Sequence, residues 1–150
     1  MNTILNTAPL YRAENGRDTL LNATLLNATL LAGRVSLGLL FAISGYGKIA
    51  GFSGTAAYMA SKGMPFAEAL LVGAIAIELV GGLMLIAGFK ARWAALAIAA
   101  FLVPTTLIFH SPVGPEGAAQ MTQFLKNLSI LGGMLYVAAF GPGAWSADRR

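Results

Sequence analysis

Four long apolar stretches constrain the fold of this chain more than any other feature. A transmembrane helix needs about 17–25 predominantly apolar residues, and each stretch meets this requirement. Only 11% of the 150 residues are charged and 57% are hydrophobic, whereas a soluble domain carries about 25% charged residues. The chain therefore lacks the polar surface of a water-soluble globule. We predict an all-α membrane protein, a four-transmembrane-helix bundle with spans at residues 30–50, 67–89, 91–109 and 124–140.

The predicted spans divide the chain into three parts. Residues 1–29 are expected to form a polar N-terminal tail and an interfacial lead-in, residues 30–143 the transmembrane domain, and residues 144–150 a basic C-terminal tail. The lead-in contains the sequence Leu-Leu-Asn-Ala-Thr twice, at residues 20–24 and 25–29. A five-residue period does not match the 3.6 residues of a helical turn, so these leucines should spiral around a helix instead of lining one face.

The basic residues predict how the bundle is oriented. Cytoplasmic loops of membrane proteins carry an excess of Lys and Arg. Seven basic residues fall on the side of the two termini and three on the opposite side, so both termini are predicted to be cytoplasmic. The first set is Arg12, Arg17, Arg34, Lys90, Arg92, Arg149 and Arg150, and the second is Lys48, Lys62 and Lys126.

Composition also excludes several functional classes. The net charge is +4, but the basic residues are scattered and do not form a patch interleaved with aromatic residues, so no nucleic-acid partner is expected. The chain has no cysteine, which excludes disulfides, iron–sulfur clusters and thiolate chemistry. Its single histidine cannot supply a bis-histidine haem site. No cofactor is therefore expected to be bound by side-chain ligation from this chain alone.

Glu78 is an acidic residue in the middle of the second predicted span. Such a residue costs about 2.5–3.5 kcal/mol on insertion scales, so it should face the bundle interior and be paired or protonated. Ala74, Gly81 and Gly82 share its helix face and would let another helix approach closely. Arg34 could snorkel to the interface, or it could pair with Glu78, because two long side chains can nearly close the difference in depth between them. The second alternative, a buried polar pair, is the prediction. Glu78 could be a proton- or quinol-linked carboxylate, or it could only hold two helices together.

Polar residues also gather at the outer ends of the predicted spans. Lys48, His110 and Asn127 come from three different helices and are predicted to lie at the same depth. Each could be an ordinary interfacial residue. Together they would form a polar mouth that offers an ammonium, an imidazole N–H and an amide N–H to a quinone headgroup, and a histidine there could transfer protons. The sequence shows no metal-ligand cluster and no nucleophile–base pair, so we predict no metal site and assign no catalytic residue.

Several short motifs follow one another in a characteristic order. They are Arg34 with Gly38, Gly45-Tyr46-Gly47-Lys48 with Phe52, Glu78-Leu79-Val80-Gly81-Gly82, Gly88, Arg92-Trp93-Ala94-Ala95-Leu96, His110, Phe124-Leu125-Lys126-Asn127-Leu128 and Gly132-Gly133. Over about residues 34–143 this series resembles the DoxX family of small bacterial membrane proteins. The resemblance implies a four-span bundle in the inner, or plasma, membrane. The long tail and the Leu-Leu-Asn-Ala-Thr repeat depart from the family pattern.

The resemblance also gives the first of three functional hypotheses. The family is named after a subunit of a thiosulfate:quinone oxidoreductase, and relatives are linked to membrane oxidoreductase complexes and redox-stress responses. An accessory subunit of such a complex is therefore the first hypothesis, with electrons carried by a quinone or by partner subunits. Whether the chain is an enzyme stays open. The alternatives are a small carrier or permease, which would need a homo-oligomer because four helices enclose little volume, and a membrane scaffold for a soluble enzyme. In every case the chain contacts the lipid bilayer.

Overall fold

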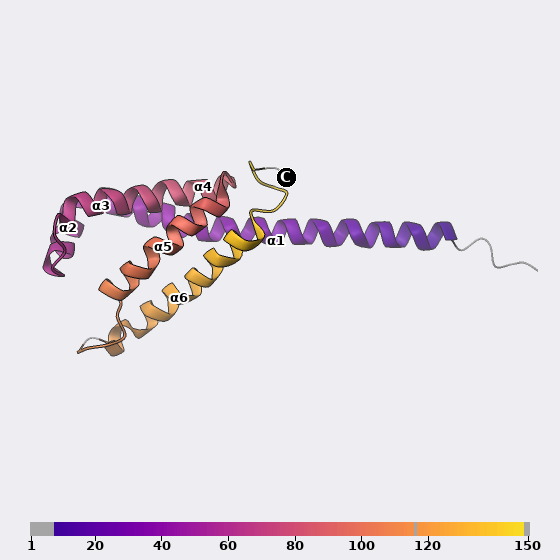
Figure 1. The fold of residues 1–150 in the computed structure, drawn as a ribbon. Coiled ribbons are helices and arrows are strands. Elements are labelled where there is room, and N and C mark those ends of the chain that lie inside the picture. The colour runs from indigo at the N-terminus through magenta and orange to yellow at the C-terminus, as the bar shows by residue number, and fades with distance from the viewer. Residues whose placement is uncertain (1–7, 116, 149–150) are drawn as a thin grey trace, which may run out of the picture.

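The computed structural model describes residues 8–115 and 117–148, with side chains from residue 18 onward in these ranges. Every regular element in the described residues is helical, which confirms the all-α prediction. The elements are α1 (Ala8–Ala50), α2 (Phe52–Ser61), α3 (Ala67–Ile75), a π-helical turn (Ala76–Val80), α4 (Gly81–Ala87), α5 (Ala91–Phe109) and α6 (Gly117–Phe140). Figure 1 shows α5 and α6 running side by side, while α3 and α4 lie along the C-terminal half of α1.

Three stretches of helix are long and apolar enough to cross a membrane. They are Asp18–Ala50 within α1, the continuous stretch Ala67–Ala87 that includes the π-helical turn, and α5. The first three predicted spans therefore have counterparts in the structure. The α6 helix begins before residue 124, and its first turns carry the polar residues Gln120, Thr122, Gln123, Lys126 and Asn127. The structure shows three apolar spans among the described residues, and a fourth span in α6 stays a prediction.

The α1 helix is longer than the first predicted span. Its 43 residues correspond to about 64 Å at 1.5 Å per residue, about twice the hydrocarbon thickness of a bilayer. The segment expected as a separate tail and lead-in thus continues the first span as one helix from Ala8, and only residues 1–7 lie outside the described residues. Pro9 is compatible with this start because a helix tolerates proline in its first turn. The leucines of the repeat are exposed around this part of α1, at Leu20, Leu21, Leu25 and Leu26.

The core of the bundle lies where α1, α4, α5 and α6 meet. The α5 helix presents a face of small residues, which includes the buried Ala91, Ala95 and Ala99, and larger side chains from its neighbours fill the space beside it. Leu85 of α4 and Met134 of α6 are both fully buried there. A second and smaller cluster joins α2 to the start of α3 through Ala56, Met59 and Leu71.

Glycine allows α1 and α4 to approach closely. A Cβ atom added to Gly82 would lie 2.6 Å from the backbone nitrogen of Ala42 and 2.7 Å from the backbone oxygen of Gly38. Real Cβ atoms do not come so close to a backbone, so only glycine fits at this crossing. Gly38 and Ala42 therefore form the part of α1 against which Gly82 of α4 packs.

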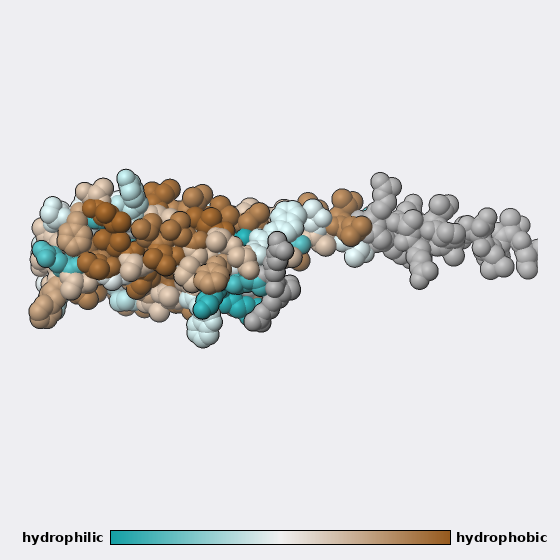
Figure 2. All heavy atoms as spheres, turned by 90° about the horizontal axis from the view of Figure 1, so that it is seen from above, coloured by the Kyte–Doolittle hydropathy of each residue, from teal (hydrophilic) through white to brown (hydrophobic). Residues whose placement is uncertain are grey.

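The outer surface of the bundle is apolar between two polar ends. Figure 2 shows brown, hydrophobic side chains over most of the visible bundle, with hydrophilic residues grouped toward its ends. Large apolar side chains from several helices are exposed, among them Ile43, Val72, Leu83, Leu107 and Leu135. A soluble monomer rarely exposes such a continuous apolar surface. This apolar surface between the two polar ends, the apolar belt, is the part of the molecule that contacts lipid.

Candidate functional site

Glu78 lies in the π-helical turn that interrupts the second span. A π-helical turn inside an α-helix inserts an extra residue and is often found at functional sites. The Glu78 side chain is 6% exposed, and its Oε2 atom lies 2.7 Å from Nζ of Lys48. The hydroxyl of Ser44 donates to the same oxygen at 3.3 Å, and the Lys48 ammonium donates to Ser44 Oγ at 2.9 Å. The buried acid is thus paired with a lysine from the end of α1.

The predicted pair of Glu78 with Arg34 is wrong. Arg34 is 2% exposed and lies at the other end of α4, where Nη1 donates to the backbone oxygens of Leu85 at 3.0 Å and Ile86 at 3.1 Å. Its Nη2 donates to the backbone oxygen of Trp145 at 2.8 Å. A cation is favoured at the C-terminal end of a helix, where carbonyl oxygens lack intrahelical partners. The Arg34 guanidinium, which was predicted to pair with Glu78, therefore binds the backbone carbonyls at the end of α4 instead.

The C-terminal segment, residues 141–148, packs against the α4–α5 turn. The backbone N–H groups of Ala147 and Asp148 donate to the backbone oxygens of Ala87 and Gly88, at 3.1 and 3.0 Å. The Asp148 carboxylate accepts from the backbone N–H groups of Lys90 at 2.8 Å and Ala91 at 3.0 Å, which caps the start of α5. Residues 144–148 were predicted as part of a tail, but in the structure they close this end of the bundle.

Gly88 makes room for this arrangement. Its φ is +68°, a left-handed conformation that ends α4 and favours glycine. A Cβ atom there would collide with Nη1 of Arg34 and with the side chain of Ser146. The positions of the Arg34 side chain and of the C-terminal segment therefore both require a glycine at residue 88.

A cavity of about 540 Å³ lies between α2, α3 and α5. Its walls are mostly apolar and include Tyr58 and Met59 of α2, Leu70 of α3 and Phe109 of α5. Two predicted site residues, Lys48 and His110, also line it. Lys48 uses two of its three N–H donors on Glu78 and Ser44, so one donor is left for a ligand. The structure therefore brings two of the three predicted mouth residues to one apolar cavity.

Asn127 is not part of this cavity. Its side chain is 8% exposed and donates to Oγ1 of Thr106 at 3.0 Å. Thr106 in turn donates to the backbone oxygen of Leu102 at 2.7 Å. The predicted convergence of three donors is corrected to two, because Asn127 faces the α5–α6 contact and has its own partner there.

Gln120 was missed by the sequence analysis. Its side-chain oxygen lies 2.9 Å from Nδ1 of His110. When Nδ1 carries the proton of a neutral histidine and donates it to Gln120, Nε2 becomes an acceptor, and only the protonated ring donates from Nε2. Gln120 thereby sets which state of His110 can bind a carbonyl or a hydroxyl group. The signal in the sequence was a polar side chain in the first turns of α6, ten residues after the histidine.

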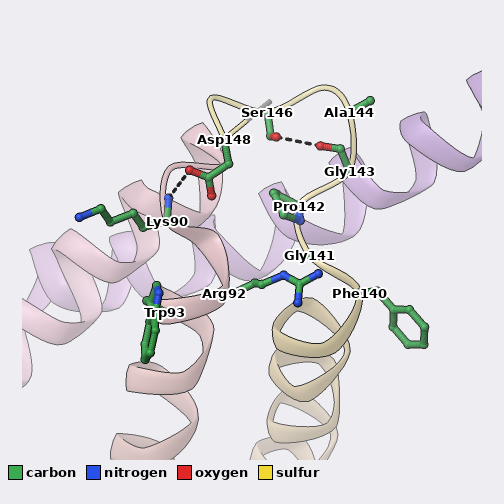
Figure 3. Close-up of a pocket in the computed structure, with 10 residues that line it drawn as sticks. All are labelled: Lys90, Arg92, Trp93, Phe140, Gly141, Pro142, Gly143, Ala144, Ser146 and Asp148. Carbon is green, nitrogen blue, oxygen red and sulfur yellow. Dashed lines mark hydrogen bonds between the residues drawn. The ribbon is translucent and has the colours of Figure 1, made fainter. Parts of the chain in front are cut away.

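A second pocket lies at the opposite end of the bundle, beside the C-terminal segment (Figure 3). It has a volume of about 960 Å³ and is lined by the start of α5, the end of α6 and the following loop. Figure 3 shows the Arg92 side chain extending toward Gly141 beneath this loop. Among the described residues, no group of three His, Cys, Asp or Glu side chains could hold a metal ion in either pocket.

Comparison with known proteins agrees with this architecture. The DoxX family model matches residues 29–111. The Escherichia coli K12 inner membrane protein YqjF is 43% identical over 119 residues, which cover 79% of this chain and 88% of the relative. The inner membrane protein YphA of the same organism is 36% identical over 123 residues, which cover 80% and 88%. No solved structure matches the chain significantly. The chain is therefore an integral inner-membrane protein that belongs to the DoxX family.

Proposed function

We propose that this protein binds a quinone in the cavity between α2, α3 and α5, and that it serves as an accessory subunit of a membrane oxidoreductase or redox-stress complex. The observation that carries the proposal is the shared position of Lys48 and His110 on a mostly apolar cavity. A quinone has an apolar ring and tail with two carbonyl oxygens, so it needs an apolar pocket with a few well-placed donors. The free donor of Lys48 and the Nε2 atom of a protonated His110 meet that need.

Proton transfer is the chemistry that these residues can add. Reduction of a quinone to a quinol takes up two electrons and two protons. The imidazole of His110 can deliver or accept a proton at Nε2. The sequence has no cysteine and one histidine, so the electrons would come from a partner subunit with its own redox centre. Lys48 is held in place by Glu78 and would orient one quinone oxygen.

The test is retention of a short-chain benzoquinone by the purified full-length protein. We expect Lys48→Met and His110→Phe each to weaken binding by about 2–10-fold, the equivalent of one hydrogen bond. Asn127→Leu is the matched control, because Asn127 is a polar residue of similar depth that does not line the cavity, and it should bind as the parent does. A parent protein that binds no quinone, or two cavity variants that bind it unchanged, would contradict the proposal.

The proposed topology has four spans and cytoplasmic termini. The 24 residues of α6 correspond to about 36 Å, which is enough to cross the hydrocarbon core. The structure also refines the sites for a labelling test. A cysteine at Gly117 would collide with the backbone of Pro112, whereas Val113 in the same loop is 81% exposed.

Single cysteines at Ser53, Val113 and Ala147 should report this topology. We expect Ser53→Cys and Val113→Cys to react with an impermeant maleimide in intact spheroplasts, because both lie on the side with fewer basic residues. Ala147→Cys should react only after lysis. Labelling of Ala147→Cys in intact spheroplasts would show that the orientation is the reverse of the proposed one. Labelling of Val113→Cys only after lysis would show that the third span is absent or runs in the opposite direction.

A further inference from the structure

The pocket beside the C-terminal segment has the composition of a lipid-headgroup site. Lys90 and Arg92 supply two cationic side chains. Lys90 Nζ lies 5.7 Å from the centroid of the Phe89 ring, and Figure 3 shows its side chain extending away from Arg92. The Asp148 carboxylate binds the backbone N–H groups at the start of α5. Two cationic side chains against this one carboxylate leave the pocket lining with a net positive charge for a ligand from outside the chain.

Large aromatic side chains flank these cations at the edge of the apolar belt. Trp93 is 72% exposed and Phe140 is 70% exposed, and both line the pocket. Phe140 stacks on Tyr136 of the preceding α6 turn, with ring centroids 5.7 Å apart. Tryptophan and tyrosine are typical of the headgroup level of a bilayer. The aromatic surface thus continues from the pocket toward the membrane interior, where an acyl chain would lie.

Glycine at position 141 keeps the Arg92 guanidinium close to the backbone. A Cβ atom at Gly141 would lie 3.1 Å from Nε and 3.2 Å from Nη2 of Arg92. Figure 3 shows this guanidinium between α5 and the end of α6, with Trp93 and Phe140 on its two sides. A planar guanidinium presents paired N–H donors that match two oxygens of a phosphate.

We propose that this pocket binds the phosphate of an anionic phospholipid. Arg92 contacts the phosphate, Lys90 adds a second charge at the rim, and the glycerol and acyl chain lie along Trp93, Phe140 and Tyr136. A free phosphate ion would use the charges but would gain nothing from the aromatic surface. The site is separate from the cavity of Lys48 and His110, so it does not depend on the proposed quinone function.

Native mass spectrometry of the full-length protein in mixed micelles tests the proposal. The micelles contain equal amounts of phosphatidylglycerol and phosphatidylcholine. We expect the parent to retain more phosphatidylglycerol, and Arg92→Gln or Lys90→Gln to reduce that retention about five-fold each. Arg92→Lys should fall between Arg92→Gln and the parent, because it keeps the charge but loses the paired donors of the guanidinium. Lys126→Gln is the matched control, since it removes an exposed lysine of α6 that does not line this pocket.

Three outcomes would overturn the assignment. The first is equal retention of the two lipids by the parent protein. The second is unchanged phosphatidylglycerol retention in both Arg92→Gln and Lys90→Gln, each confirmed as folded by its melting temperature. The third is displacement of phosphatidylglycerol by excess inorganic phosphate, which would assign the pocket to a soluble phosphate ligand instead of a lipid.

Discussion

Arg34→Met should lower the stability of the folded protein by about 3 kcal/mol. The substitution removes three hydrogen bonds from a charged donor, to the backbone oxygens of Leu85, Ile86 and Trp145. Each such bond contributes about 1.5–3 kcal/mol, and part of that sum is offset because a buried guanidinium no longer has to be desolvated. The expected fall in melting temperature is about 5–10 °C. Thermal unfolding in detergent measures it.

The position of Arg34 predicts a second effect of the same substitution. Its bond to Trp145 ties the C-terminal segment to the α4–α5 turn, so Arg34→Met should also make that segment easier to cleave by protease. Arg34→Lys should fall between methionine and the parent, because a lysine has fewer and differently placed donors. Lys126→Met is the control, since Lys126 is exposed and lines neither pocket, and it should change stability by less than about 0.5 kcal/mol. Equal melting of Arg34→Met and the parent would mean that the arginine does not hold this end together.

Glu78→Ala should lower the stability by about 3 kcal/mol as well. It leaves the Lys48 ammonium beside the bundle interior with only Ser44 as a hydrogen-bond partner, and loss of one partner of a buried pair typically costs about 3–5 kcal/mol. We expect the lower end because Lys48 is 27% exposed. Glu78→Gln should cost less, since an amide oxygen can still accept from lysine and serine. Membrane abundance and melting temperature report the difference.

The double variant Lys48→Met with Glu78→Leu separates pairing from simple packing. Removing both charges together leaves no unpaired ion, so the double variant should be more stable than Glu78→Ala. It should nevertheless bind quinone about 2–10-fold more weakly than the parent, because the donor of Lys48 is gone. If Glu78→Ala accumulated and melted like the parent while a redox phenotype was lost, Glu78 would act in turnover and not in assembly.

Much of the fold could be predicted because hydropathy and spacing determine it. The bounds of α5 at residues 91 and 109 are those expected. Ala74, Gly81 and Gly82, which were predicted to share a face with Glu78, are all buried, but Gly82 packs against α1 and Gly81 against Ile98 of α5. The long start of α1 was not predicted, because polar and charged residues were taken to end the helix although a helix can continue into water. The α2 helix lies between the first two predicted spans, at residues for which no helix was predicted.

The partners of the buried polar residues could not be predicted in the same way. Depth along a helix was used to pair Arg34 with Glu78, but depth gives no information on rotation about the helix axis. The groups that bind Arg34 are backbone carbonyls, which every residue has and no sequence pattern marks. Rotation also separates Asn127 from Lys48 and His110, although the three lie at similar predicted depth. The π-helical turn around Glu78 shifts the register that a regular 3.6-residue period assumes.

Photo-crosslinking would locate a bound quinone directly. A quinone with a photoreactive group is added to the purified full-length protein, and the labelled peptides are mapped by mass spectrometry with and without excess unmodified quinone. Binding in the proposed cavity predicts labels on its lining, such as Tyr58, Met59 and Phe109, that disappear with competitor and are weaker in His110→Phe. Labels spread over the lipid-facing belt, unchanged by competitor, would show that this cavity is not a quinone site.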